Sequence, residues 1–277
     1  MVKKCRARDG DSMQGVAARY GTIRAMPGRL TARFLCGAVV STGALPSLGV
    51  ASAPAEPCPD VQVVFARGTG EPPGVGPTGQ AFVDSLRPRL GARSLDVYPV
   101  NYPASDEWAT GLDGIRDEGA HVVSMANTCP NTKMVLGGYS QSAAVTGFVT
   151  SAAVPDGVDP ATVPKPLDPK IADHVAAVVL FAMPNVRAMN FLGQPPVSIG
   201  PAYQAKTIKL CAPEDPVCSD GMNFAAHDSY AGDGAMIDRG AAFAANHVGP
   251  PPPGQSPPPA PAPPPPPPPA DDQQPGA

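Results

Sequence analysis

The chain has 277 residues, with 20 Lys and Arg against 24 Asp and Glu, which gives a net charge of −4 with neutral histidines. Residues 56–277 alone hold 12 basic and 22 acidic side chains, so this part has a net charge near −10. Such a charge argues against binding to nucleic acid or to an anionic membrane through electrostatic attraction.

Residues 1–55 have the composition of an export leader. Basic residues precede an apolar run over residues 34–50, which is followed by the small residues Ala53-Pro54-Ala55. We expect cleavage after Ala55, and translation from Met13 or Met26 would shorten the long basic start. A membrane anchor is the alternative, but glycines and a proline interrupt a run shorter than the ~20 residues of a membrane span. The sequence therefore predicts a secreted protein.

Residues 56–249 are expected to form one domain in which strands alternate with helices. Apolar runs with little alternation are typical of strands covered on both faces, and they occur at Val61–Ala66, Leu95–Tyr102, Lys133–Gly137, Val175–Ala182 and Lys206–Cys211. Stretches of helical length occur at Gly79–Leu90, Leu112–Asn127, Gln141–Ala153 and Gly234–Asn246. This pattern predicts an α/β fold, a three-layer α/β/α sandwich with a mostly parallel five-stranded sheet.

The segment 250–277 is a separate, proline-rich tail in which 16 of 28 residues are proline. It lacks backbone donors and apolar bulk, so we expect a disordered tail with extended polyproline II character. A solvated spacer is the simplest interpretation. Contact with a cell-wall matrix, or with an aromatic groove of a partner, is the alternative.

Four cysteines follow the leader: Cys58, Cys129, Cys211 and Cys218. An even number in an exported chain predicts disulfides. The short separation of Cys211 and Cys218 favours a local bridge, which leaves Cys58 with Cys129. A zinc site would want tighter cysteine or histidine clusters than this sequence contains, so no metal is expected.

Ser140 lies where a predicted strand turns into a predicted helix. The strand ends in two glycines, and an apolar stretch of helical length follows Gln141. A tight turn of this kind around Gly138-Tyr139-Ser140 is the setting of a nucleophile elbow, which exposes a serine Oγ on a strained turn. The usual motif has glycine two residues after the serine, whereas this chain has Ser142. The motif alone therefore fits either a nucleophile or a plain strand-to-helix turn.

A serine nucleophile needs a base, and the base needs an acid that orients it. His227 follows the last predicted strand, so its loop is expected near the elbow at the carboxyl ends of the strands. Asp215 is the preferred acid, because two neighbouring prolines and a local disulfide would fix its direction. Glu214 and Asp228 are its rivals. The order Ser140, Asp215, His227 is that of the α/β hydrolases.

The other histidines of this domain are His121, His174 and His247, and we interpret them as structural or surface residues because they flank core elements or end a helix. An oxyanion needs hydrogen-bond donors. The backbone N–H of Gln141 follows the nucleophile, and the loop Arg67–Gly70 could supply a second N–H and a hydroxyl.

Several stretches together carry a resemblance that the elbow alone does not. The chain resembles the secreted cutinase-like proteins of mycobacteria, in the cutinase branch of the α/β hydrolases. The matching stretches lie in family order within residues 58–248: Phe65-Ala66-Arg67-Gly68-Thr69, Val100-Asn101-Tyr102-Pro103-Ala104, Gly137-Gly138-Tyr139-Ser140-Gln141, Leu210-Cys211-Ala212-Pro213-Glu214-Asp215-Pro216-Val217-Cys218 and Ala226-His227.

The resemblance implies a Ser140–His227–Asp215 triad, with Thr69 and Gln141 as the oxyanion pair. It also implies the bridges Cys58–Cys129 and Cys211–Cys218, and an accessible serine without a large lid. On this basis we place Trp108, Met222 and Phe224 at the rims of an acyl-chain crevice, with ordinary loop anchoring as the alternative.

Two features depart from the family pattern. Ser142 replaces the usual glycine, which puts the rate of catalysis in doubt more than the role of Ser140 as nucleophile. The proline-rich segment Val154–Asp173 is longer than a minimal connection, and we interpret it as a surface excursion rather than a cover over the site.

The sequence thus predicts a secreted serine esterase, expected as a monomer, that hydrolyses uncharged esters of short to medium acyl chains without metal or cofactor. A phospholipase or thioesterase with the same triad is the alternative within enzymes. A catalytically idle surface protein that acts through its proline-rich tail is the alternative of a different class.

Overall fold

The computed structural model describes residues 57–250, so the predicted leader and proline-rich tail lie outside the described residues. Its five strands are β1 (Val61–Ala66), β2 (Leu95–Pro99), β3 (Lys133–Tyr139), β4 (Val175–Phe181) and β5 (Thr207–Leu210). They form one sheet in the order β2-β1-β3-β4-β5, and every neighbouring pair is parallel. The predicted five-stranded α/β fold is confirmed.

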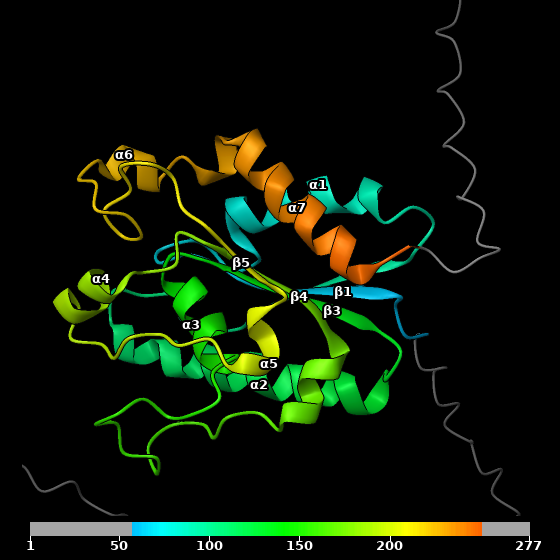
Figure 1. Cartoon of the computed structure of the whole chain (residues 1–277), viewed down its shortest axis with the longest axis horizontal. Coiled ribbons are helices and arrows are strands. Elements are labelled where there is room, and N and C mark those ends of the chain that lie inside the picture. The colour runs from blue at the N-terminus through cyan, green and yellow to red at the C-terminus, as the bar shows by residue number, and fades with distance from the viewer. Residues whose placement is uncertain (1–56, 251–277) are drawn as a thin grey trace, which may run out of the picture. The chain divides into compact units, whose positions relative to one another are not determined.

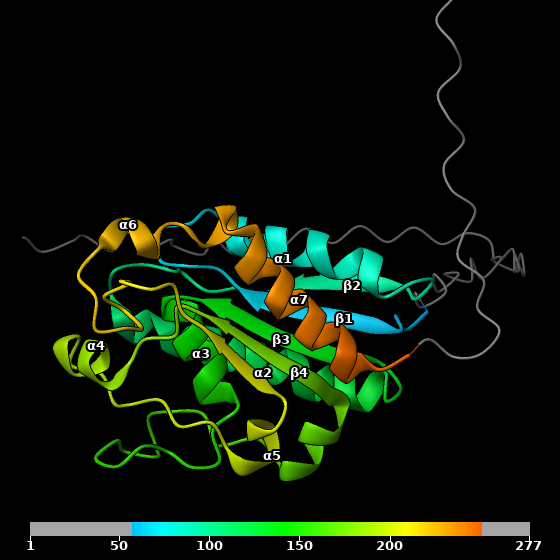
Figure 2. The same ribbon diagram turned by 45° about the horizontal axis from the view of Figure 1, so that its top comes forward.

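Helices cover both faces of this sheet. They are α1 (Gly76–Arg89), α2 (Gly111–Thr128), α3 (Gln141–Val149), α4 (Val186–Phe191), α5 (Pro201–Gln204), α6 (Phe224–His227) and α7 (Gly234–Val248). The long helices α1 and α7 lie on one face, while α2 and α3 lie on the other (Figures 1 and 2). The short helices α4 and α6 lie at the end toward which the strands point (Figure 2). In parallel α/β sheets this end carries the functional loops.

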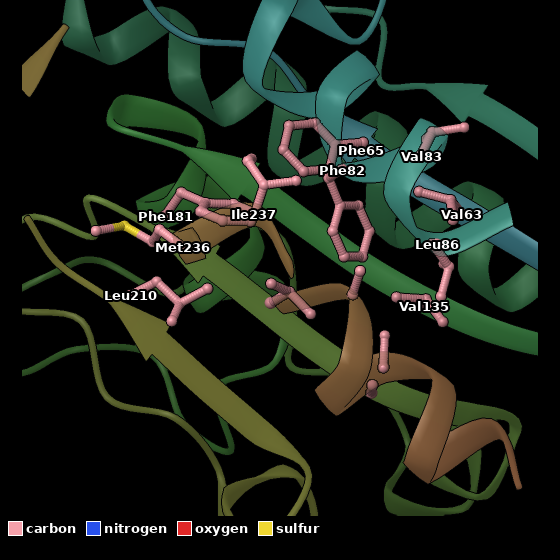
Figure 3. Close-up of a cluster of buried hydrophobic side chains, with 14 of the residues drawn as sticks. Val63, Phe65, Phe82, Val83, Leu86, Val135, Phe181, Leu210, Met236 and Ile237 are labelled. Carbon is pink, nitrogen blue, oxygen red and sulfur yellow. The ribbon is translucent and has the colours of Figure 1, made fainter. Parts of the chain in front are cut away.

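Between the sheet and helices α1 and α7 lies a core of aromatic and branched side chains (Figure 3). Its centre is formed by Phe65, Phe82 and Phe181, whose ring centroids are 5.9–6.4 Å apart in tilted and edge-on arrangements. Phe65 needs unusual space, since a Cβ added at Gly79 or Gly137 would lie 2.6 Å from its ring. Glycines in α1 and β3 are therefore what admit this ring between them.

The opposite face contains a buried carboxyl group. Glu118 of α2 is fully buried, and its Oε2 lies 3.0 Å from Thr146 Oγ1 of α3. Burial raises the pKa of Glu118 well above its usual value. The same Thr146 Oγ1 lies 3.1 Å from the carbonyl of Gly137, and a hydroxyl has one proton to give. A protonated Glu118 can donate to Thr146 while Thr146 donates to Gly137, which satisfies both contacts.

Several predicted boundaries differ from those observed. The second strand ends at Pro99 rather than Tyr102, because the chain turns away after a last bond from Val100 N to the carbonyl of Phe65 (3.0 Å). Helix α3 ends at Val149 rather than Ala153, and α1 begins earlier, at Gly76. Helices α4, α5 and α6 were not predicted, because four to six residues carry too little periodicity to be recognised.

Two disulfides confirm the predicted pairing. Cys58 is joined to Cys129 and Cys211 to Cys218. The first links the start of the domain to the end of α2, and the second closes the loop that follows β5. With sequence separations of 71 and 7, the chain-entropy model gives about 4.4 and 2.5 kcal/mol of stabilisation. Within residues 57–250, no helix is both long and apolar enough to cross a membrane.

Candidate active site

Ser140 occupies a strained turn between β3 and α3. Its backbone has φ 60° and ψ −121°, a conformation that non-glycine residues rarely adopt. The turn is held because Ser140 N donates to the carbonyl of Phe181 on β4, at 3.0 Å. A Cβ at Gly138 would lie 2.4 Å from the carbonyl oxygen of Ser142, so only glycine permits this close approach. The geometry is that of a nucleophile elbow.

Ser142, which departs from the usual elbow motif, stabilises the turn. It is fully buried, and its Oγ accepts from Tyr139 N at 2.8 Å. The same hydroxyl lies 2.5 Å from the carbonyl of Ala66 on β1 and 2.9 Å from that of Tyr139. It can donate to one of them at a time. The serine therefore connects both ends of the elbow to the neighbouring strand, a contact that glycine cannot make.

The structure brings Ser140, His227 and Asp215 together, although they are far apart in the sequence. Ser140 Oγ lies 2.9 Å from His227 Nε2. On the other side of the ring, Nδ1 lies 3.1 and 3.0 Å from the two carboxylate oxygens of Asp215. Because a carboxylate accepts, Nδ1 carries the proton and Nε2 presents its lone pair to the serine hydroxyl.

Among the three candidate acids, Asp215 is the one whose carboxylate contacts the His227 ring. Asp215 is fully buried, whereas Glu214 and Asp228 are exposed to solvent. Its Oδ1 accepts from Val217 N at 2.8 Å and its Oδ2 from the Tyr230 hydroxyl at 2.7 Å. These donors compensate the burial of a charge and fix the direction of the carboxylate.

Two tyrosines that sequence reasoning missed support this arrangement. Tyr230 is buried, and besides donating to Asp215 its hydroxyl accepts from Ala212 N at 2.8 Å. Tyr139 stacks on the His227 ring with centroids 5.3 Å apart, and its hydroxyl donates to the His227 carbonyl at 2.6 Å. Burial, as the largest cause, raises the pKa of both tyrosines, so both hydroxyls keep their protons. For Tyr230, the only signal in the sequence was its position three residues after His227.

The loop after β1 lies beside the elbow because β1 and β3 are neighbours, with Ala66 opposite Gly138. Thr69 is half-buried in this loop. The loop is held by the buried Arg67, which donates to the carbonyls of Glu71 (2.8 Å) and Tyr102 (2.7 Å), and by a bond from Gly70 N to the carbonyl of Ala104 (2.7 Å).

Gln141 begins α3, so its backbone N–H has no partner within the helix. Its buried side chain donates from Nε2 to the carbonyl of Ser105 at 2.9 Å, which ties the elbow to the Ser105–Gly111 loop. Of the two predicted donors of an oxyanion site, Thr69 thus lies in the loop after β1, and Gln141 begins the helix that follows the neighbouring strand β3.

The remaining histidines are engaged elsewhere. His121 stacks on Tyr98 and contacts Gln62 Oε1 at 2.8 Å, and burial lowers its pKa. His174 and His247 each contact a backbone carbonyl, at 3.1 and 2.9 Å. None of these contacts reaches Ser140. Within residues 57–250, no cluster of three or more histidine, cysteine or acidic side chains is arranged to hold a metal ion.

An apolar cavity of about 690 Å³ begins next to the elbow, at Gln141 and Trp108. Much of its wall comes from residues 153–167. Residues 154–167 belong to the predicted surface excursion Val154–Asp173; none of them is buried, and their inner side lines this cavity. Met222 and Phe224, also expected at a crevice, are 75% and 66% exposed and do not line this cavity.

Comparisons with known proteins identify relatives of this chain. The family model described as Cutinase matches residues 57–248. The probable carboxylesterase Culp5 of Mycobacterium tuberculosis is 55% identical over 168 residues, which are 61% of this chain and 95% of the relative. Carboxylesterase Culp1 of Mycobacterium bovis is 45% identical over 77% of this chain and 94% of its own length. Phospholipase Culp4 of Mycobacterium tuberculosis is 40% identical over 83% and 95%.

Solved structures share the fold. A Trichoderma reesei cutinase in complex with a phosphonate inhibitor is 32% identical, with a TM-score of 0.51, and the match covers 69% of this chain and 78% of the cutinase. An acetyl xylan esterase matches with a TM-score of 0.57 at 24% identity, over 70% of this chain and all of the esterase, and supports the fold alone. The family model and the relatives leave no ambiguity: the chain belongs to the cutinase family.

Proposed function

We propose that the protein is a secreted serine esterase in which Ser140, His227 and Asp215 form the catalytic triad. Carboxylic ester hydrolysis follows from membership of the cutinase family and from relatives named carboxylesterases. The observation that carries the assignment of residues is the continuous contact from Ser140 Oγ to His227 Nε2 (2.9 Å) and from His227 Nδ1 to Asp215 (3.0 Å).

In the proposed mechanism, Ser140 Oγ attacks the ester carbonyl while His227 Nε2 takes its proton. Asp215 stabilises the imidazolium that forms, and His227 then gives the proton to the leaving alcohol. The backbone N–H of Gln141 and the Thr69 loop hold the oxyanion, each donor contributing about 3 kcal/mol. Water then attacks the acyl-enzyme while His227 takes its proton, and His227 returns this proton to Ser140 Oγ as the bond to the acyl group breaks and the acid leaves. This chemistry requires no metal or cofactor.

The proposed substrates are uncharged esters with short to medium acyl chains, including lipids and polyesters. The exposed side chains of Met222 and Phe224 support contact with such apolar substrates at the rim of the site. Two disulfides fit an extracellular protein, because such bonds persist in oxidising compartments. Phospholipase activity is the second candidate, and the relative named Phospholipase Culp4 favours it.

The test is hydrolysis of p-nitrophenyl butyrate by the oxidised, exported chain, beside Ser140→Ala and a matched control, Ser124→Ala. Ser124 is an exposed serine of α2 outside the site. We expect Ser140→Ala to abolish hydrolysis and Ser124→Ala to retain it. Activity that survives in Ser140→Ala would refute the nucleophile. Wild-type activity that survives deletion of residues 251–277 would exclude a protein that acts only through its tail.

A further inference from the structure

The floor of the cavity beside the site is built by one face of each of two helices. Helix α2 contributes residues 112, 115, 116, 119, 120 and 123, and α3 contributes residues 141, 144, 145, 148 and 149. These are steps of three and four residues, the spacing of a single helix face. Such apolar faces normally pack against other core side chains, whereas here part of each faces open space.

The roof is the segment 153–167, which crosses the outer side of α2 and α3 (Figure 1). On the side opposite the two helices, the cavity is lined by Val154, Val158, Val163, Leu167 and three prolines. Prolines suit an apolar wall because they bring no backbone N–H that must be satisfied. Among the described residues, one hydrogen bond joins residues 154–167 to α2, from Arg116 Nη2 to the carbonyl of Thr162 at 3.4 Å. The roof therefore rests mainly on apolar contact.

The position of the cavity relative to the triad determines which part of an ester it can receive. The leaving oxygen must lie near His227 Nε2, and the carbonyl oxygen near Gln141 N. The cavity is lined by no residue between 196 and 250, the part of the chain that carries His227, and it begins at Gln141. Because Gln141 directly follows the nucleophile and lines the cavity, an acyl substituent that leaves Ser140 along α3 enters this cavity.

The length of the floor limits the chain that fits. From Gln141 to Val149 the face of α3 extends about 12 Å, and from Leu112 to Val123 the face of α2 extends about 16 Å, at about 1.5 Å per residue. With carbon–carbon bonds of about 1.5 Å, an extended zigzag chain advances about 1.3 Å per carbon, so roughly ten to fourteen carbons span this distance. The volume of about 690 Å³ lies in the range of pockets that enclose a whole ligand.

We propose that this cavity is an acyl-binding site, and that the enzyme selects acyl chains of about ten to fourteen carbons over shorter ones. The proposal rests on the proposed esterase function and narrows its substrate to the upper end of the range. Each methylene that enters the cavity should raise kcat/KM by up to about fourfold, and the gain should stop once the floor is covered.

The first test is a series of p-nitrophenyl esters from butyrate to palmitate, kept below the concentrations at which they aggregate. We expect kcat/KM to rise to a maximum at about ten to fourteen carbons. Gly119→Phe should block the cavity, because a Cβ at this position points toward the roof and lies 3.8 Å from Leu167 Cδ2. We expect it to lower the decanoate-to-butyrate ratio of kcat/KM by at least about tenfold. Ser124→Phe, on the exposed side of the same helix, should leave the ratio unchanged.

The second test reads binding without catalysis. Trp108 is the single tryptophan of the chain and lines the cavity, so its fluorescence reports on occupancy. Titration of the Ser140→Ala protein with decanoate should change the emission of Trp108 at concentrations where butyrate has no effect. Adding Gly119→Phe should remove this response.

The outcomes separate the two proposals. One outcome is that the wild type hydrolyses no ester, while decanoate changes Trp108 fluorescence and Gly119→Phe removes this change. This result would refute the esterase function and retain the cavity as an acyl site. Hydrolysis of butyrate without a rise for longer chains, together with an unchanged Trp108 signal, would overturn the acyl site and retain the esterase.

Discussion

Removal of the Tyr230 hydroxyl tests whether this side chain stabilises the buried Asp215. In Tyr230→Phe, the carboxylate loses a donor at 2.7 Å, and the buried N–H of Ala212 loses its acceptor at 2.8 Å. The ring itself stays, so its packing in the core is unchanged. The substitution therefore isolates the hydroxyl.

The size of the effect follows from these two contacts. A hydrogen bond to a charged group contributes about 1.5–3 kcal/mol, and a buried N–H left without a partner costs about 1–3 kcal/mol. Because the two contacts share one hydroxyl, they do not add fully, and we expect Tyr230→Phe to lower the free energy of unfolding by about 3 kcal/mol. For a domain of this size, that corresponds to a fall in Tm of roughly 6–12 °C.

Tyr203→Phe is the matched control. Tyr203 is also buried, at 5% exposure, but its hydroxyl has no hydrogen-bond partner among the described residues. Removing an unpartnered buried hydroxyl should be neutral or slightly stabilising. Urea unfolding of both variants at pH 7, with disulfides intact, measures the difference. Equal effects of the two substitutions, or a neutral Tyr230→Phe, would refute the role assigned to the Tyr230 hydroxyl.

Two further predictions concern buried polar groups. Ser142→Ala should lower the free energy of unfolding by about 1–3 kcal/mol in urea, because Tyr139 N loses its acceptor, while Ser124→Ala should change it by less than about 0.5 kcal/mol. Burial raises the pKa of Glu118 well above 4.5, so the stability linked to its protonated form is present below pH 4.5 and is lost as pH rises through the folded-state pKa. Glu118→Gln keeps a donor for Thr146 and should remove this decline, which reaches at most about 1.4 kcal/mol per pH unit; unfolding curves of both proteins that keep the same pH slope would contradict it.

The sequence by itself determined the features that depend on neighbours along the chain. The strands and long helices could be read from apolar runs because backbone hydrogen bonding and burial impose local periods. The strand-to-helix turn at Ser140 could be predicted because a tight turn needs Gly138, whereas the motif alone did not distinguish a nucleophile from a plain turn. The bridge Cys211–Cys218 followed from a separation of 7 residues, which closes with little loss of entropy, and it left Cys58 with Cys129.

Only the tertiary structure decided which groups meet across the fold. Asp215, Glu214 and Asp228 are chemically similar and all lie near His227 in sequence, but only Asp215 is buried against its ring. The role of Tyr230 depends on how the chain after His227 folds back over the loop that carries Asp215, which no local pattern encodes.

The cavity shows the same division most clearly. Proline and valine in residues 153–167 are equally compatible with a surface excursion and with a roof, because composition records how apolar a segment is but not what lies beneath it. Packing decides that question, since α2 and α3 turn apolar faces toward this segment and leave space between them. The candidate triad could thus be proposed from residues along the chain, whereas the cavity arises from contacts between distant segments.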